Sequence, residues 1–293
     1  MAWLRVSVAV DGADGDRVSD LLQALGALSV TADAAGADEL LEPAPGTTPL
    51  WRTVRLQALF DVERPLGDIT EALRAAGHAL ADVDFVDDAD WMDSWRAHAV
   101  RRAFAGRLWL LPRDEPLPEA AQGGVVLRLD PGLAFGSGSH ETTRLCLEWL
   151  AAVDLAGARL LDFGCGSGIL AVAACLLGAA RVVAVDHDPQ ALVATRDNAA
   201  YNSIEASRLE VLTAAELPEP ATPFDVVIAN ILANPLIELA PRLTALVRPG
   251  GRLVLSGLLA TQADAIRASY PQIRFEPVVQ DGDWIRMDGV RVA

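Results

Sequence analysis

Glycine occupies every second position in the loop Asp162-Phe163-Gly164-Cys165-Gly166-Ser167-Gly168. A mostly apolar run, Arg159 to Phe163, precedes the glycines, and a helix-like run, Ile169 to Leu177, follows them. A buried strand, a glycine-rich turn and a helix in this order are typical of nucleotide-binding α/β folds. Glycine lets the backbone turn sharply here, and it lets a ligand approach main-chain N–H groups that a Cβ atom would shield.

The glycine spacing distinguishes between two kinds of cofactor. Dinucleotide-binding loops have the pattern G-x-G-x-x-G, in which the third glycine comes one residue later than Gly168 does here. The pattern that begins at Asp162, D-x-G-x-G-x-G, instead fits the loop that binds S-adenosylmethionine in methyltransferases. Because a glycine-rich loop alone is also compatible with a simple tight turn, other residues must support a cofactor site.

Asp186 is a second candidate for cofactor binding. It ends the run Arg181 to Asp186, which reads as a buried parallel strand. A carboxylate at the end of such a strand, beside the glycine loop, can accept hydrogen bonds from both ribose hydroxyls. The alternative is a helix N-cap, although Asp188, directly before Pro189, suits that role better. The loop and the acid together predict a nucleoside-bearing cofactor and leave NAD and S-adenosylmethionine both open.

The composition is that of a folded protein with room for two domains, since the chain has 293 residues of which 52% are hydrophobic. The amino terminus shows no signal-peptide pattern, and the longest run of small apolar residues, Gly168 to Ala180, is too short to span a bilayer. We therefore expect a cytoplasmic protein that acts away from membranes. The three cysteines and four histidines show no metal-ligand spacing, so neither a disulfide framework nor a metal site is predicted.

The charge is acidic and uneven. The net charge is −16, and residues 1–100 hold 18 acidic but only 7 basic side chains. Such a surface repels nucleic acid phosphates and attracts basic proteins. A merely soluble acidic surface explains the charge equally well. The acidic charge therefore favours a basic protein as partner over direct binding of nucleic acid.

Strand and helix patterns alternate in the first part of the chain in the order β-α-β-β-α-β. The segments are Trp3 to Val10, Arg17 to Leu28, Leu28 to Thr31, Leu50 to Phe60, Leu66 to Ala76 and Ala79 to Val86. This order is that of a ferredoxin-like unit. Because no catalytic cluster occurs in it, we interpret the unit as a recognition module, with a purely structural role as the alternative.

A second glycine-rich stretch, Asp130 to Thr143, precedes the helical pattern Arg144 to Ala152. Main-chain N–H groups and the hydroxyl of Thr143 can face a ligand at this helix N-terminus. Helix capping explains Ser139 and one threonine without any ligand, but it does not explain the glycines before them.

Asn230 follows the strand pattern Phe224 to Ala229, which places it at the same sheet edge as the glycine loop. Its alternative role is a polar strand-end cap. Methyltransferases that act on base amines often carry [DN]-P-P-[YF] at this place, and the run from Asn230 to Ala233 has neither the prolines nor the aromatic residue. A nucleic acid base is therefore disfavoured as substrate. Strand patterns at Gly251 to Gly257 and within Ile273 to Val292 complete a mostly parallel sheet with an antiparallel edge.

Three long motifs in order make the chain similar to a known family: D-P-G-L-A-F-G-S-G-S-H-E-T-T from Asp130, L-L-D-F-G-C-G-S-G-I-L-A from Leu160 and F-D-V-V-I-A-N-I-L-A-N-P-L from Phe224. Over nearly its whole length the chain resembles the bacterial methyltransferases of large-subunit ribosomal protein eleven. The resemblance implies a Rossmann-like class I methyltransferase domain, with a mostly parallel seven-stranded sheet, joined to a small ferredoxin-like α+β substrate-recognition domain. One departure is Glu141, where many relatives carry proline.

The same resemblance implies the domain boundaries. Residues 1–89 are the ferredoxin-like domain, residues 90–112 a linker helix and connection, and residues 113–293 the S-adenosylmethionine-dependent methyltransferase domain. Trp91 and Trp95 lie four residues apart in the linker and share one face of a helix. We expect this pair to pack between domains rather than to contact substrate.

Site residues carry over by motif: Thr143, Gly164, Gly166, Gly168, Asp186 and Asn230 are expected to bind S-adenosylmethionine, and Asn230 also to orient the amine. His140 is the nearest candidate for a general base, although a structural hydrogen bond in its loop is the favoured interpretation. The implied reaction methylates lysine side chains and the N-terminal α-amine of ribosomal protein eleven, and we expect the enzyme to be a monomer. The alternatives are a methyltransferase for another basic protein, a nicotinamide-dependent oxidoreductase, and a binding protein without cofactor affinity.

Overall fold

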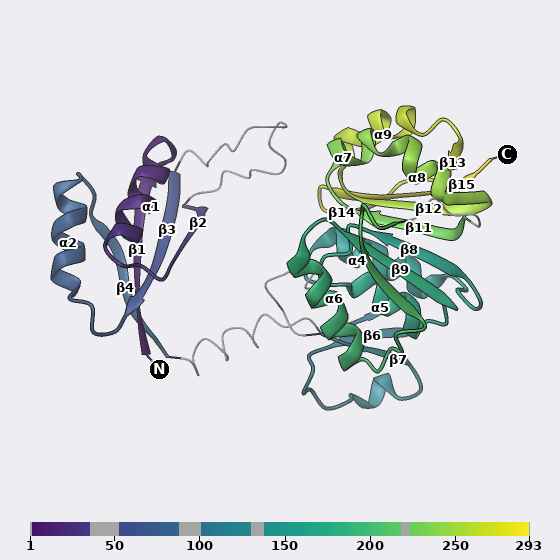
Figure 1. Cartoon of the computed structure of the whole chain (residues 1–293), viewed down its shortest axis with the longest axis horizontal. Helices are drawn as coiled ribbons and strands as arrows, with labels where there is room; N and C mark the ends of the chain where they lie inside the picture. Colours follow the sequence, from purple (N-terminus) through teal and green to yellow (C-terminus); the bar gives the residue numbers. More distant parts are fainter. Residues whose placement is uncertain (1, 36–52, 88–100, 130–137, 218–222, 293) are drawn as a thin grey trace. The chain divides into compact units, whose positions relative to one another are not determined.

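A computed structural model of the chain describes residues 2–35, 53–87, 101–129, 138–217 and 223–292. The chain divides into two compact units, residues 1–97 and residues 98–293 (Figure 1). None of the helices in these described ranges is long and apolar enough to cross a membrane.

The first unit is a four-stranded antiparallel sheet covered by two helices on one face (Figure 1). Its elements are β1 (Ala2–Asp11), the 3-10 turn η1 (Gly12–Asp14), α1 (Gly15–Ala24), β2 (Ser29–Ala34), β3 (Thr53–Asp61), α2 (Leu66–Ala75) and β4 (Leu80–Asp87). The strand order is β2-β3-β1-β4 with antiparallel neighbours, which confirms the predicted ferredoxin-like arrangement. The predicted start of the third strand, residues 50–52, lies outside the described residues.

Alternation of apolar and polar residues explains this packing. In β3, exposed and buried side chains alternate from Thr53 to Asp61, as expected for a strand with one covered face. The helices contribute apolar residues four apart, Val18 and Leu22 on α1 and Ile69 and Leu73 on α2. All four side chains belong to one core with the buried faces of β1 and β3.

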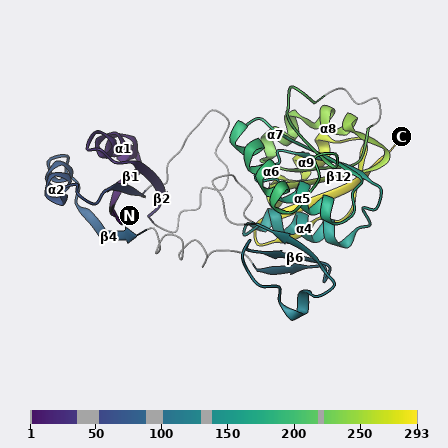
Figure 2. The ribbon, with the colours of Figure 1, turned by 60° about the horizontal axis from the view of Figure 1, so that its bottom comes forward.

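The second unit begins with a small sheet that the sequence patterns did not predict. Strands β5 (Arg102–Phe104), β6 (Leu108–Leu111) and β7 (Val125–Arg128) form it, with the 3-10 turn η2 (Glu119–Ala121) before β7. The β5–β6 hairpin turns at Ala105 and Gly106, which have φ angles of 45° and 64°. The small sheet packs against two helices, α4 (Glu141–Ala152) and α5 (Ile169–Leu176) (Figure 2). The start of the predicted linker, residues 90–100 with Trp91 and Trp95, lies outside the described residues, and its remainder, residues 101–112, contains strands β5 and β6.

Alternating strands and helices make up the rest of the second unit. They are α4 (Glu141–Ala152), β8 (Arg159–Phe163), α5 (Ile169–Leu176), β9 (Arg181–Asp186), α6 (Pro189–Tyr201), β10 (Leu209–Thr213), β11 (Phe224–Asn230), α7 (Ala233–Glu238), α8 (Ala240–Leu246), β12 (Val247–Leu259), η3 (Ala260–Gln262), α9 (Ala263–Ser269), β13 (Ile273–Phe275), β14 (Val279–Asp281) and β15 (Trp284–Arg291).

The large sheet has the order β10-β9-β8-β11-β12-β15-β13. The first five strands in this order run parallel, and β15 inserts antiparallel between β12 and β13. These seven strands confirm the predicted mostly parallel sheet. The first strand of the predicted terminal pair is divided in two, since β13 and β14 each pair antiparallel with β15 and β14 is an eighth member of the sheet.

Both faces of the large sheet are covered, because successive residues of a strand point to opposite faces. On β8, Leu160 belongs to the core formed with α4 and α5, whereas Leu161 belongs to the core formed with α7, α8 and α9. The same division separates Val182 from Val183 on β9. Strands buried on both faces explain the continuous apolar runs in the sequence.

Candidate active site at the carboxyl edge of the large sheet

The strand order reverses between β8 and β11, and this point defines the candidate site. The chain proceeds outward from β8 through β9 to β10, and then from β11 through β12 on the other side. In open α/β sheets, ligands bind outside the carboxyl ends of the strands at such a switch point. The glycine loop after β8, Asp186 at the end of β9 and Asn230 at the end of β11 all lie at this edge.

The loop after β8 requires glycine at the predicted positions. Gly164, Gly166 and Gly168 have φ angles of 79°, 53° and 77°, in the region that side chains with a Cβ atom rarely adopt. A Cβ atom on Gly164 would lie 2.3 Å from Cγ2 of Ile231, and one on Gly168 would lie 2.7 Å from the Thr195 side chain. Gly164 and Gly168 therefore let the loop pass close to Ile231 and Thr195.

Asp186 accepts hydrogen bonds from three backbone amides at the end of β9. Its Oδ2 accepts from the N–H of Gly166 at 2.9 Å, and its Oδ1 accepts from those of His187 at 2.7 Å and Asp188 at 3.0 Å. The N-cap of α6 is Asp188, whose Oδ1 accepts from the N–H of Gln190 at 2.8 Å. Since a carboxylate has about four acceptor positions, Asp186 retains capacity for a ligand hydroxyl.

Asp162 is a site residue to which the sequence patterns assigned no role. It is fully buried on β8, and its Oδ2 accepts from the N–H of Ala171 at 3.0 Å. Its Oδ1 has no hydrogen-bond partner among the described residues. Burial raises the pKa of this carboxyl from 3.8 to about 7. The first acidic position of D-x-G-x-G-x-G was the signal that could have singled it out.

Thr143 and Asn230 meet at the edge of the sheet, although 87 residues separate them. Thr143 is fully buried in the first turn of α4, and Nδ2 of Asn230 lies 3.4 Å from its hydroxyl oxygen. Within the described ranges, the buried Oδ1 of Asn230 accepts no hydrogen bond. A buried acceptor of this kind is costly unless a ligand donates to it.

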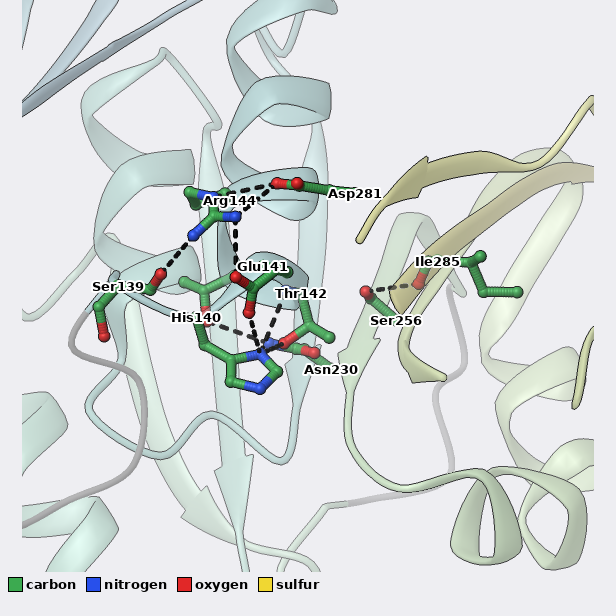
Figure 3. A network of polar contacts seen from close by, with 10 residues as sticks. Ser139, His140, Glu141, Thr142, Arg144, Asn230, Ser256, Asp281 and Ile285 are labelled. Carbon is green, nitrogen blue, oxygen red and sulfur yellow. Dashed lines mark hydrogen bonds and ion pairs between the residues drawn. The ribbon is translucent and has the colours of Figure 1, made fainter. Parts of the chain in front are cut away.

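Arg144 holds the start of α4 in place (Figure 3). Its guanidinium donates to the carbonyl oxygen of Ser139 at 2.6 Å and to Oε1 of Glu141 at 3.0 Å. It also donates twice to Oδ2 of Asp281 on β14, from Nη2 at 2.7 Å and from Nε at 3.1 Å. The sequence did not predict this contact, because Asp281 is 137 residues away.

His140 caps α4. Its Nδ1 accepts from the N–H of Thr142 at 3.3 Å and lies 2.8 Å from the Thr142 hydroxyl (Figure 3). The ring also packs edge-on against Trp284, with centroids 4.8 Å apart. Burial lowers the pKa of His140 below 6.5, so the neutral imidazole predominates at neutral pH. Since Nδ1 accepts a backbone hydrogen bond, the imidazole caps the first turn of α4.

One part of the predicted site, the glycine-rich approach to α4 at residues 130–137, lies outside the described residues. No group of three or more His, Cys, Asp or Glu side chains that could hold a metal ion occurs in the described ranges.

The fold and the site define a class of protein. A mostly parallel sheet with β15 inserted antiparallel between β12 and β13, a D-x-G-x-G-x-G loop at the end of β8 and an acid at the end of β9 are the features of a class I methyltransferase. The family model "Ribosomal protein L11 methyltransferase (PrmA)" matches residues 2–292. The chain belongs to this family.

Individual relatives agree with the family model. A ribosomal protein L11 methyltransferase of Azotobacter vinelandii is 48% identical over 295 residues, which cover 99% of this chain and 100% of the relative. One of Methylococcus capsulatus is also 48% identical, with 99% of both chains covered. Among solved structures, a ribosomal protein L11 methylase of Lactobacillus delbrueckii subsp. bulgaricus matches with a TM-score of 0.58 and 31% identity, covering 64% of this chain and 96% of that one.

Family membership settles several of the sequence-based expectations. The family consists of S-adenosylmethionine-dependent protein methyltransferases, so the predicted family, enzyme class and cofactor are confirmed. The alternative of a nicotinamide-dependent oxidoreductase is wrong.

Proposed function

We propose that this chain transfers methyl groups from S-adenosylmethionine to amino groups of ribosomal protein L11, namely lysine side chains and the N-terminal α-amine. The family supports the substrate, since its relatives are named for it. The observation that carries the chemistry is the buried, unpartnered Oδ1 of Asn230 beside Thr143, an acceptor at the switch point of the sheet.

The cofactor site would consist of Thr143, Gly164, Gly166, Gly168, Asp186 and Asn230. The residues fit S-adenosylmethionine because its ribose hydroxyls and cationic groups need acceptors, and this edge offers Asp186, Asp162 and Asn230. The loop glycines let the backbone come close to a ligand without a Cβ atom in the way. Bound S-adenosylmethionine supplies an electrophilic methyl group on a sulfonium centre, so the protein mainly orients the amine and excludes water.

The amine must be neutral when it attacks. A lysine amine has a pKa of about 10.4 in water, so only a small fraction is neutral at neutral pH. Burial of the amine beside the cationic sulfonium would lower that pKa. Oδ1 of Asn230 would accept a hydrogen bond from the amine and align its lone pair with the methyl group.

We further propose that the acidic first unit recognises the substrate. Residues 1–100 carry 18 acidic and 7 basic side chains, a balance that complements a basic protein and repels RNA. The enzyme would act as a monomer in the cytoplasm, on the protein itself and without direct contact to nucleic acid.

Intact-mass spectrometry of purified ribosomal protein L11 tests this function. Incubation with the chain and S-adenosylmethionine should add one or more methyl groups, each of about 14 Da, and peptide mapping should place them on lysines or the α-amine. A parallel reaction with excess S-adenosylhomocysteine should show no addition. An unmodified L11, despite cofactor binding by the enzyme, would contradict the proposed substrate.

A further inference from the structure

Two buried polar side chains of α6 donate hydrogen bonds to the glycine loop after β8. Neither has a role in the site described above. Thr195 and Asn198 lie three residues apart on one face of the helix. Thr195 is fully buried and Asn198 is 7% exposed. Buried polar side chains in a helix are retained when they hold a specific partner, and here the partners are backbone carbonyls of the loop.

Thr195 contacts the middle of the loop. Its hydroxyl donates to the carbonyl oxygen of Gly166 at 3.0 Å and lies 3.4 Å from Sγ of Cys165. A Cβ atom on Gly168 would come within 2.7 Å of both Oγ1 and Cγ2 of Thr195. Thr195 is thus packed directly against the loop as well as hydrogen-bonded to it.

Asn198 contacts the next residue of the loop, Ser167. Its Nδ2 donates to the carbonyl oxygen of Ser167 at 2.8 Å, and its Oδ1 accepts from Nη2 of Arg113 at 2.8 Å. The guanidinium of Arg113 lies 4.5 Å from the ring centroid of Tyr201, also on α6. The arginine therefore determines which end of the amide faces the loop.

Gly166 is held from two sides as a result. Its N–H donates to Asp186 on β9, and its carbonyl oxygen accepts from Thr195 on α6. A glycine has wide conformational freedom, and ordering such a residue costs conformational entropy. Fixing its position before the ligand arrives removes that cost from binding.

We infer that Thr195 and Asn198 are positioning residues for S-adenosylmethionine, which order the glycine loop from the side of α6. The inference rests on the proposed function, because it requires the cofactor at this loop. Neither side chain is assigned a contact with the cofactor or the amine; both act through the backbone of Gly166 and Ser167.

Thr195→Val tests the inference with little change in shape, since valine replaces the hydroxyl by a methyl group. The dissociation constant of S-adenosylhomocysteine, measured by calorimetry, should rise about tenfold, equivalent to about 1.4 kcal/mol. Thr195→Ser keeps the donor and should stay within about twofold of the original chain. In steady-state kinetics with varied S-adenosylmethionine, Thr195→Val should raise KM for the cofactor and change kcat much less.

Tyr270→Phe is the matched control. Its hydroxyl is equally buried and donates to a backbone carbonyl, that of Leu236 at 2.7 Å, in the core on the other face of the sheet. It should lower the melting temperature comparably but leave the affinity for S-adenosylhomocysteine unchanged. If both variants weakened binding equally, the effect of Thr195→Val would be general destabilisation and the inference would be wrong.

Asn198→Ala provides an independent variant, which should also weaken S-adenosylhomocysteine binding. Unchanged affinity in folded Thr195→Val and Asn198→Ala, with tight binding by the original chain, would overturn the positioning role alone. Absence of binding by the original chain would instead overturn the proposed cofactor site. The two failures are therefore distinguishable.

Discussion

Arg144 on α4 and Asp281 on β14 form an ion pair, with 2.7 Å between Nη2 and Oδ2. The pair connects the β14–β15 hairpin to the helix turn that contains Thr143, whose hydroxyl lies beside Asn230. Arg144 also donates to Ser139 and Glu141, so one guanidinium connects the start of α4 to β14. Its side chain is only 19% exposed, which distinguishes it from pairs at the open surface.

Replacement of Arg144 by Met should therefore loosen the start of α4. We expect a loss of about 1 kcal/mol in the free energy of unfolding and a higher KM for S-adenosylmethionine. Urea denaturation and steady-state kinetics measure the two effects. Arg267→Met is the control, because Arg267 pairs with Asp264 three residues away at an exposed position and should cost little. Equal behaviour of the two variants would mean that the Arg144 contacts have no special role.

Asn230→Ala should impair methyl transfer more than cofactor binding. Without Oδ1 the attacking amine loses its hydrogen-bond acceptor, and misplacement of a reacting group by about 1 Å costs on the order of 100-fold in rate. Single-turnover methylation of ribosomal protein L11, together with calorimetric binding of S-adenosylhomocysteine, separates the two steps. A single-turnover rate close to that of the original chain would return Asn230 to the role of a strand-end cap.

Asp186→Asn should weaken cofactor binding. The amide group would present N–H donors where the backbone of Gly166 and the ribose hydroxyls both need acceptors, so the dissociation constant of S-adenosylhomocysteine should rise at least tenfold, or about 1.4 kcal/mol. Asp188→Asn is the matched control, since asparagine caps a helix as well as aspartate does. If both variants bound S-adenosylhomocysteine with equal affinity, Asp186 would have no role in cofactor binding and would only accept hydrogen bonds from the backbone.

Asp162 should make the ligand-free enzyme less stable as the pH rises. Its pKa is raised from 3.8 to about 7 by burial, so the folded chain binds a proton that the unfolded chain has lost between these values. Stability from this group is complete below pH 3.8 and is lost as the pH rises through about 7. Asp162→Asn cannot titrate, so its melting temperature minus that of the original chain should rise between about pH 4 and about pH 7 and level off above. A pH-independent difference would contradict the prediction.

Removal of residues 1–97 should abolish methylation of ribosomal protein L11 and preserve binding of S-adenosylhomocysteine. The first unit has a hydrophobic core of its own, and the described cores of the second unit contain no residue from it. The shortened chain, assayed by calorimetry and by mass spectrometry of L11, would separate the two functions. Loss of cofactor binding in a folded truncated chain would assign the first unit a structural role.

The order of neighbouring residues in the sequence was enough to predict several features of this protein. Glycines at positions 164 and 168 are needed because the backbone has positive φ and close neighbours, requirements that glycine spacing expresses directly. Asp188 could be distinguished from Asp186 as the helix cap because capping depends on adjacent residues. The parallel strands were predictable since burial on both faces leaves a continuous apolar run.

Contacts between distant segments were decided only by the tertiary structure. The pairing of β6 with β7, the ion pair of Arg144 with Asp281 and the unpartnered Oδ1 of Asp162 leave no periodic signal in the sequence. Thr195 and Asn198 read as ordinary polar positions of a helix until α6 is placed against the loop. Periodicity reports which face of an element is buried, whereas the partner of a buried polar atom depends on how the elements pack.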